Sequence, residues 1–374
     1  MESLRVNTCR LYKLTESIKM AIWLIRGGKY GEHEERFLKD NRIYLTWGGL
    51  QALDLSIASD FDQVRGLVQS NYPGESVNKI GNWTGQIWAF TLAMKEKDWV
   101  VMPKKGKGTI ALAEIGSVYK YDASAEGDYR HYREVCWLNQ DVPRGAFDQD
   151  LLYSMGAFLT VCEIKRNNAE ARIRAMFKNG FDSPIPNVTI AQLLPTNGKQ
   201  AQNDAVEEVE ETGNFDIEQY TRDLIAKFII QKFKGHGLAR LVDAVLKAQG
   251  YTTYLSPEGP DKGIDILAAK GSLGFESPKI CVQVKSGDTP SDRPELTQLI
   301  GAIQNSQAEN GLFVSWSGFK SSVYREVPSQ FFKVRLWDAN DLIEQILENY
   351  ESLDQTIKSE LPLKRIWTLV DGEV

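Results

Sequence analysis

Residues that would mark several common classes of protein are scarce in this sequence. The 374 residues include only four cysteines, with no CxxC pair, and three histidines that lie far apart. These absences exclude a disulfide-rich scaffold, a thiolate zinc site and the HExxH helix of zinc hydrolases. The GxxxxGK[ST] loop that cradles nucleotide phosphates is also missing. We therefore expect reduced, buried thiols and no P-loop chemistry.

Long apolar runs are missing as well. No segment approaches the roughly 18 consecutive apolar residues of a membrane-spanning helix. The first residues, MESLRVNTCRLYKLTE, lack the apolar centre of a secretion signal. Hydrophobic residues make up 42% and charged residues 25% of the chain, which is typical of a globular protein. We expect a cytoplasmic protein without a membrane partner, and the length predicts two domains.

The composition changes after residue 194. Residues 195–213 contain five acids and no aromatic residue, so they cannot bury enough apolar surface to form a core. We interpret them as an acidic flexible linker between an N-terminal domain, residues 1–194, and a C-terminal domain, residues 214–374. Of the net charge of −6, the linker and the C-terminal domain each carry −4, and residues 1–195 carry about +2. The overall acidity therefore does not exclude a nucleic-acid partner.

The C-terminal domain alternates helical and β-type segments. Helical spacing covers residues 215–250, 295–307, 321–331 and 341–350, and β-type runs cover residues 251–255, 264–269, 280–285, 311–316 and 334–337. Helices before and after a central mixed sheet indicate an α/β sandwich.

Three polar residues occupy strands where apolar residues would be expected. Asp265 lies inside the run IDILAA at the start of its strand, and Gln283 and Lys285 alternate with valines in CVQVK. The period of two places Gln283 and Lys285 on one face, and a neighbouring antiparallel strand would let Asp265 face them. A carboxylate, an amide oxygen and an ammonium group suit phosphodiester hydrolysis. The carboxylate would hold Mg²⁺, and the lysine would position or deprotonate the nucleophile. Alternatively, Asp265 ends a turn and Lys285 is a surface lysine on an edge strand.

These runs, followed by GLFVSWSGFK and VRLWDANDL, resemble the Mrr-like restriction endonuclease domain of the PD-(D/E)xK superfamily. The resemblance covers about residues 236–337. It implies that Asp265 binds the metal, that Gln283 takes the place of the second acid in a QxK variant, and that Lys285 is the catalytic lysine. The family's first-helix glutamate is absent, because HGLARLV offers Leu238 and Ala239 there. The accessory acid would then come from the preceding turn, with Glu258 and Asp261 as candidates, although both equally suit plain turn residues.

The resemblance implies Mg²⁺ as the cofactor, with Mn²⁺ as a substitute, and double-stranded DNA as the partner. Polar residues on the 295–307 helix and after the 311–316 strand would approach the phosphate backbone, or would be ordinary solvated residues. They are Gln298, Gln304, Ser315, Ser317 and Lys320.

The N-terminal domain is rich in aromatic residues and mildly basic. Strands are expected at residues 21–25 and 42–46 and a helix at residues 83–94. The glycine-rich turn KKGKG, with Lys104, Lys105 and Lys107, separates two further strands and predicts a hairpin. We expect these lysines to contact the DNA backbone, unless they simply form a solvated face.

The aromatic helix, the DWVVMP strand and the AxAEIG strand are similar to PUA-like domains of the EVE and YTH types. That resemblance covers about residues 22–137 and implies a small curled β-sheet that holds a modified or flipped base. Trp47, Asn82 and Trp83 are the pocket candidates, because they lie at turns or element ends; the alternative is that the tryptophans belong to the core.

Together these features predict a β-rich PUA-like reader followed by a restriction-endonuclease-like α/β sandwich. The function would be that of a modification-dependent, type IV-like endonuclease that defends against foreign DNA and acts as a homodimer or larger assembly on modified duplexes. Two alternatives stay open. One is a nuclease of this fold gated by a small nucleotide or a protein partner, and the other is a DNA-binding protein whose catalytic site has decayed.

Overall fold

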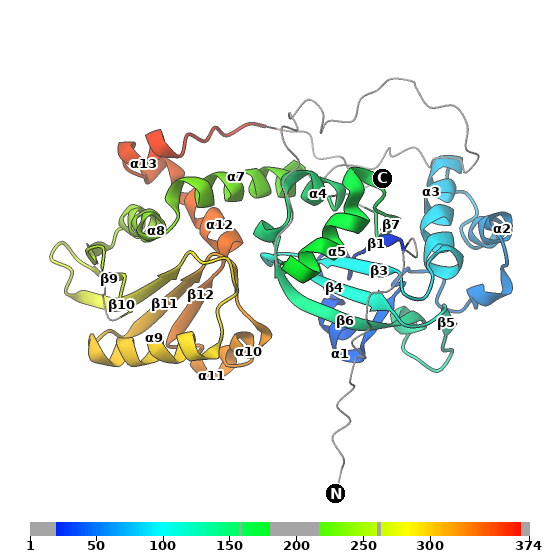
Figure 1. The fold of residues 1–374 in the computed structure, drawn as a ribbon, viewed down its shortest axis with the longest axis horizontal. Coiled ribbons are helices and arrows are strands. Elements are labelled where there is room, and N and C mark those ends of the chain that lie inside the picture. The colour runs from blue at the N-terminus through cyan, green and yellow to red at the C-terminus, as the bar shows by residue number, and fades with distance from the viewer. Residues whose placement is uncertain (1–19, 157–158, 180–216, 260–262, 368–374) are drawn as a thin grey trace, which may run out of the picture.

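The computed structural model describes residues 20–156, 159–179, 217–259 and 263–367. The predicted linker, residues 195–213, lies outside these ranges. The described chain forms two halves, each built on its own β-sheet (Figure 1). The fold class is mixed α and β, as predicted.

The N-terminal half contains a curled, mostly antiparallel sheet with the order β2-β6-β4-β3-β1-β7, and β5 pairs with β6. Only β1 and β3 run parallel within it. The strands are β1 (Ile22–Ile25), β2 (Arg42–Tyr44), β3 (Trp99–Pro103), β4 (Thr109–Ile115), β5 (Lys120–Tyr121), β6 (His131–Pro143) and β7 (Val161–Glu163). The hairpin predicted around KKGKG is confirmed, since β3 and β4 pair antiparallel.

Helices cover both faces of this sheet, which explains why β1 and β3 are apolar and buried throughout. The helices are α1 (Glu34–Asp40), α2 (Phe61–Asn71), α3 (Val77–Trp88), α4 (Gln149–Ser154) and α5 (Ala169–Asn179), with a π-helical turn η2 (Ala89–Ala93) after α3. Short 3₁₀ turns are η1 (Leu55–Ile57), η3 (Gly127–Tyr129), η4 (Arg144–Ala146) and η5 (Arg166–Asn168). One core lies between the sheet and α2 and α3, and a second lies between the sheet and α4 and α5. The PUA-like assignment stays a prediction.

The C-terminal half contains a five-stranded mixed sheet with the order β12-β11-β10-β9-β8. The strands are β8 (Thr252–Leu255), β9 (Ile266–Lys270), β10 (Glu276–Lys285), β11 (Asn310–Ser315) and β12 (Val334–Trp337). β8, β9 and β10 pair antiparallel, whereas β10, β11 and β12 pair parallel. The predicted central mixed sheet is therefore confirmed.

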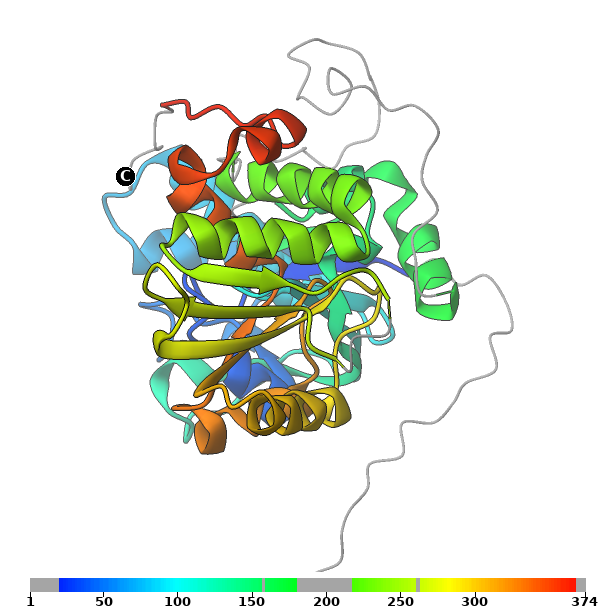
Figure 2. The ribbon, with the colours of Figure 1, turned by 90° about the vertical axis from the view of Figure 1, so that its left-hand side faces the viewer.

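Helices pack on both faces of the second sheet, as Figures 1 and 2 show. Helices α7 (Ile217–Phe233), α8 (His236–Ala248) and α12 (Ala339–Asn349) cover one face, and α9 (Arg293–Asn305) covers the other. The short helices α10 (Ser321–Tyr324), α11 (Val327–Gln330) and α13 (Gln355–Glu360) and the turn η6 (Tyr350–Ser352) complete this half. The single helix predicted over residues 215–250 is divided between α7 and α8 at Gly235, whose φ of 74° interrupts helical geometry.

The structure also bears on the lack of long apolar runs and on the state of the cysteines. Among the residues that the structure describes, no helix has both the length and the apolar character needed to cross a bilayer. Cys162 and Cys281 are free thiols, which agrees with the expectation of reduced cysteines at these two positions.

Candidate active site

Asp265 and Gln283 lie side by side where β9 begins. β9 and β10 run antiparallel with Ile266 opposite Val282, and the Asp265 backbone N–H donates to the Val282 carbonyl at 3.0 Å. The Asp265 carboxylate also accepts a hydrogen bond from the Val284 backbone N–H at 2.7 Å. The predicted antiparallel juxtaposition is confirmed, and the backbone of β10 fixes the position of the Asp265 carboxylate.

Lys285 is the last residue of β10 and lies two positions beyond Gln283, so both side chains leave the same face of the sheet. Its backbone carbonyl accepts a hydrogen bond from the Trp316 N–H at 2.8 Å. The side chain is half-buried, and it makes no ion pair to another described residue. The candidate lysine is thus anchored through its backbone.

The amide of Gln283 carries an unusual feature. Its side chain is 1% exposed, and its Oε1 has no hydrogen-bond partner among the described residues. A buried amide oxygen normally has a partner, because burial without one is costly. Amide and carboxylate oxygens are both ligands that a hard divalent cation takes. Within the described ranges no three acidic, histidine or cysteine residues cluster into a ligand cage.

The turn before Asp265 contains the accessory candidates. Glu258 is exposed there, and Asp261 lies outside the described residues. His236, at the start of α8, was not predicted as a site residue, yet its Nε2 is 2.9 Å from the Ser256 carbonyl. The Ser256 N–H in turn donates to the Asp265 carbonyl at 2.8 Å. His236 therefore positions this turn, and only its place at a helix start, after a glycine, hints at that in the sequence.

Leu238 and Ala239, which stand where Mrr-like domains often have a glutamate in the first helix, are both buried. Leu238 is 0% and Ala239 2% exposed on α8. Neither side chain can supply a carboxylate, so the departure noted in the sequence is real.

The residues predicted to approach the DNA phosphate backbone lie in different environments. Gln298 and Gln304 are exposed on α9, whereas Ser315 and Ser317 are buried and donate to the carbonyls of Gly318 and Gly287 at 2.7 and 2.6 Å. The two serines therefore stabilise loops around the strand ends. Lys320 pairs with Asp292 at 2.9 Å, and hydrogen bonds from Ser322 and Lys320 hold the pKa of Asp292 below its usual value.

Two of the three residues predicted to form a base pocket in the N-terminal half lie close together. The rings of Trp47 and Trp83 meet edge to face with centroids 6.3 Å apart, and Tyr72 meets Trp83 at 4.7 Å. Both tryptophans are half-buried against the core. Asn82 is on α3 with Trp83, but its Oδ1 accepts a hydrogen bond from Gln86 at 2.7 Å. Tyr72 was missed, because α2 itself was not predicted.

The three lysines of the β3–β4 turn have different environments. Lys104 is 7% exposed and pairs with Asp141 at 2.6 Å, so its ammonium group does not face solvent. The Lys107 ammonium lies 5.7 Å from the ring centroid of Tyr324, in the other half. Lys105 is exposed. The turn therefore lies against the C-terminal half, so the alternative of a plain solvated face is wrong for Lys104, and contact of these lysines with the DNA backbone stays a prediction.

The two halves are joined by polar contacts that the sequence did not predict. Arg144 on η4 donates to both carboxylate oxygens of Asp223 on α7, at 2.9 and 2.6 Å. Asp338, which caps α12, accepts a hydrogen bond from the Gly108 N–H at 3.1 Å. Ser321 donates to Asp141 at 2.8 Å. These contacts hold the β3–β4 turn and η4 against the C-terminal half.

The C-terminal half matches a known class of protein. Residues 230–346 match the family model Mrr_cat, described as a restriction endonuclease, and residues 23–152 match a model described as a domain of unknown function, DUF8426. The chain therefore contains an Mrr-like restriction endonuclease domain.

A curated relative supports this assignment. The type IV methyl-directed restriction enzyme EcoKMrr of Escherichia coli (strain K12) is 34% identical over 89 residues, which cover 24% of this chain and 28% of the relative. The chain thus spans less than a third of the length of the curated relative that it matches.

Two solved structures were also found. The DNA modification-dependent restriction endonuclease AspBHI has a TM-score of 0.32 and 16% identity, covering 78% of this chain and 76% of its own. The MspJI restriction endonuclease in complex with a 27-mer oligonucleotide has a TM-score of 0.29 and 13% identity, covering 78% of this chain and 71% of its own.

Proposed function

We propose that this protein is a modification-dependent DNA endonuclease that serves in defence against foreign DNA. The observation that carries the proposal is the placement of the Asp265 carboxylate beside the unpartnered, buried Oε1 of Gln283, with Lys285 on the same face. This grouping occurs inside the segment that matches the restriction endonuclease family. We assign catalysis to residues 214–374 and recognition to residues 1–194, joined by residues 195–213.

Each candidate residue has a role that follows from its chemistry. Asp265 would hold Mg²⁺, or Mn²⁺ as a substitute, with Gln283 Oε1 as a neutral neighbour. When bound, such a cation lowers the pKa of a coordinated water and offsets charge on the phosphate. Lys285 would hold the nucleophile or the phosphate by hydrogen bonds. The hydrogen bond from the Val284 backbone N–H holds the Asp265 carboxylate in position at the proposed cation site before substrate binds.

The N-terminal half would read the modified base. The contact between Trp47 and Trp83 provides partly exposed aromatic faces in one place, and a base removed from the helix is stabilised by stacking on such faces. Tyr72 extends this cluster. Asn82 would contribute only if its bond to Gln86 were exchanged for one to the base.

The partner is double-stranded DNA, and we propose a homodimer on it. Each chain has one candidate catalytic site, whereas cutting both strands of a duplex requires two. A symmetric pair of chains is the commonest way to supply two equal sites.

Plasmid cleavage tests this proposal. Plasmids with and without methylated or hydroxymethylated cytosine and adenine would be incubated with the full-length protein in Mg²⁺, in Mn²⁺ or in chelator. We expect metal-dependent cleavage that is selective for modified plasmid. Asp265→Ala and Lys285→Ala should each lose at least about 100-fold in rate, since one such group typically contributes 10²–10⁴.

Matched controls lie close to the site. Asp288 and Lys234 form an exposed ion pair at 3.1 Å that is outside the proposed machinery, so Asp288→Ala and Lys234→Ala should cleave at the parental rate. No cleavage on any substrate in metal, or full activity in the Asp265 and Lys285 variants, would overturn the proposal.

A further inference from the structure

The start of α8 contacts two loops that lie next to the candidate catalytic residues. It consists of the N-cap Gly235 and the first helical residue, His236. The N–H of Gly235 donates to the loop after β10, and the ring of His236 contacts the loop after β8. Two consecutive residues of one helix start therefore contact the segment next to Lys285 and the segment that leads to Asp265.

The first contact lies beside Lys285. The Gly235 backbone N–H donates to Oγ of Ser286 at 2.9 Å, and Ser286 directly follows Lys285, the last residue of β10. The Lys285 carbonyl also accepts a hydrogen bond from the N–H of Trp316, the residue after β11, at 2.8 Å. The end of β10 is therefore held by two separate segments, the start of α8 and the end of β11.

The second contact supports the loop that leads to Asp265. The Nε2 of His236 lies 2.9 Å from the Ser256 carbonyl. Because a carbonyl oxygen can only accept a hydrogen bond, Nε2 carries the hydrogen in this contact. Ser256 donates in turn to two carbonyls, from its N–H to Asp265 at 2.8 Å and from its Oγ to Ile264 at 2.6 Å. The His236 ring thus holds Ser256, and Ser256 holds the two residues that precede β9.

The same loop borders the amide of Gln283. A Cβ atom at Gly263 would lie 3.3 Å from the Gln283 Nε2, so the backbone there packs closely against the amide. The Asp265 carboxylate, at the end of this loop, accepts the hydrogen bond from the Val284 N–H at 2.7 Å. A displacement of the loop would therefore shift the Asp265 carboxylate and change the space around Gln283.

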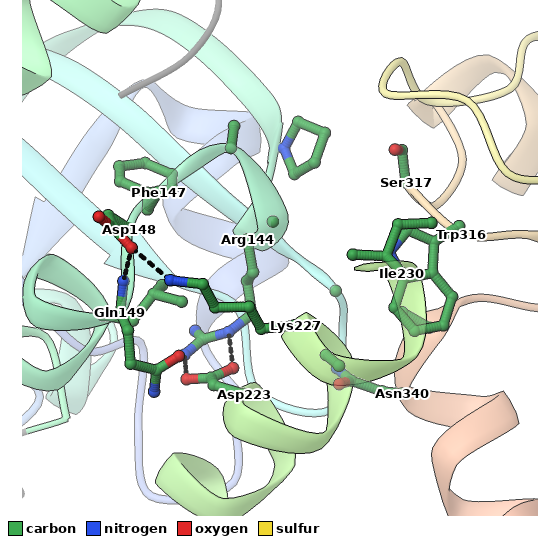
Figure 3. A pocket seen from close by; sticks show the side chains of 17 residues that line it. Arg144, Phe147, Asp148, Gln149, Asp223, Lys227, Ile230, Trp316, Ser317 and Asn340 are labelled. Carbon is green, nitrogen blue, oxygen red and sulfur yellow. Dashed lines mark hydrogen bonds and ion pairs between the residues drawn. The ribbon is translucent and has the colours of Figure 1, made fainter. Parts of the chain in front are cut away.

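The start of α8 has a firm support in α7. Phe233, the last residue of α7, is fully buried in the C-terminal core. The other side of α7 is bound to the N-terminal half, where Asp223 pairs with Arg144 at 2.6 Å (Figure 3). Figure 3 also shows Lys227 of α7 paired with Asp148, at 2.7 Å. The bonds of the α8 start therefore place the two loops relative to a helix that is itself fixed.

We propose that Gly235 and His236 are positioning residues, which together set the separation between the Asp265 carboxylate and the Lys285 ammonium group. The inference rests on the proposed function, in which both groups act on one phosphate. Catalysis is sensitive to such placement, because a shift of about 1 Å in reacting groups can lower a rate roughly 100-fold. One helix start that holds both segments fixes this separation before substrate binds.

Hydrogen exchange of the full-length protein in chelator tests the positioning without cleavage. The backbone amides of Ser256, Asp265 and Val284 all donate hydrogen bonds. In His236→Ala we expect the amides of Ser256 and Asp265 to exchange about 10-fold faster, because one supporting hydrogen bond is lost. The amides of β11 should exchange as in the parent. His236→Gln should restore slow exchange, since its Nε2 donor takes the place of the imidazole Nε2.

Plasmid cleavage supplies the second arm. His236→Ala should lose about 10- to 100-fold in rate, as residues that orient a metal ligand typically do, and His236→Gln should recover most of it. Ser286→Ala removes the acceptor of the Gly235 N–H and should also cleave more slowly, whereas Ser286→Thr keeps the hydroxyl and should not. Lys234→Ala is the matched control. Its exposed pair with Asp288 adds little, so both measurements should equal those of the parent.

The outcomes separate this inference from the proposed function. Normal cleavage by His236→Ala, or unchanged exchange at Ser256 and Asp265, overturns the positioning role. A uniform rise in exchange along the whole chain, or no recovery in His236→Gln, assigns His236 to general stability and overturns it as well. If His236→Ala does not fold, His236→Asn, which is too short to reach the Ser256 carbonyl, takes its place. A parent protein that cleaves no plasmid overturns the proposed function, and the exchange measurement then decides whether His236 holds the loop.

Discussion

Arg144 and Asp223 form a buried, two-pronged ion pair that joins the halves of the protein, with side chains only 10% and 7% exposed. Arginine suits this position because its planar guanidinium group matches both carboxylate oxygens. Breaking a buried pair leaves an uncompensated charge, which is much more costly than losing an exposed pair.

We therefore expect Asp223→Asn to lower the free energy of unfolding by about 3–5 kcal/mol and to loosen the docking of the halves. Denaturant unfolding and the radius of gyration from X-ray scattering would measure these effects. Glu75→Gln removes an exposed pair with Lys79 and should change stability by less than about 1 kcal/mol. Equal effects of the two substitutions would show that the interdomain pair has no special role.

Gln283 offers a test of the metal assignment. Gln283→Glu would add a second carboxylate beside Asp265, so we expect half-maximal cleavage at a lower Mg²⁺ concentration. Gln283→Leu removes the unpartnered oxygen and should require more Mg²⁺ while remaining folded. Cleavage rates measured across a Mg²⁺ series would check this. Identical metal dependence in the parent and both variants would contradict a place for Gln283 beside the cation.

Two adjacent lysines should behave differently toward DNA. Lys105 is exposed, so Lys105→Ala should weaken binding to all duplexes and reduce the slope of log K against log salt by about 1. Lys104 is buried with Asp141, so Lys104→Met should lower stability by about 1–3 kcal/mol and leave the salt slope unchanged. Salt titrations of DNA binding would compare them. A lower slope in Lys104→Met would mean that its pair with Asp141 opens on DNA.

The raised pKa of the Asp341 carboxyl group should make the stability of the protein depend on pH. Burial, assisted by the nearby Asp338 charge, raises the pKa of Asp341 from 3.8 to about 6. The native state therefore prefers the protonated acid, and its contribution to stability is lost as the pH rises from about 4 to 6. Asp341→Asn should stabilise the protein at pH 8 by about 1–3 kcal/mol and have little effect below pH 4. Thermal unfolding at both pH values would test this, with Asp288→Asn as the exposed control.

Trp83 tests the proposed reader. If a modified base stacks on this ring, Trp83→Leu should reduce binding to modified duplex by about 5- to 150-fold, because stacking contributes roughly 1–3 kcal/mol per base. Binding to unmodified duplex should change little, and Trp83→Phe should recover most of the difference. Equal losses on modified and unmodified DNA would place Trp83 in the core instead.

The sequence predicted the C-terminal sheet well because its signals are local. Alternation in CVQVK and the turn before IDILAA marked two strands, and their antiparallel pairing brought Asp265 to Gln283. The catalytic roles of these residues and of Lys285 stay predictions.

Other features depend on contacts between distant segments, which no short pattern encodes. The strand β6 mixes charged and apolar residues in HYREVCWLNQDVP and was not predicted. Lys104 and Lys105 look alike in sequence, yet only Lys104 is enclosed, because Asp141 lies opposite it. Arg144 and Asp223 are 79 positions apart.

Helix α7 has a practical consequence for building hybrid enzymes. It precedes most of the segment that matches the restriction endonuclease family, and it packs against α8 and α12 as well as against α4 and η4. A fusion that transplants residues 214–374 onto another recognition module would bring Asp223 without Arg144. The graft would then expose the apolar side of α7 or bury an unpaired carboxylate. A portable version of the cleavage domain needs a neutral residue at position 223, or a new module that supplies its own arginine.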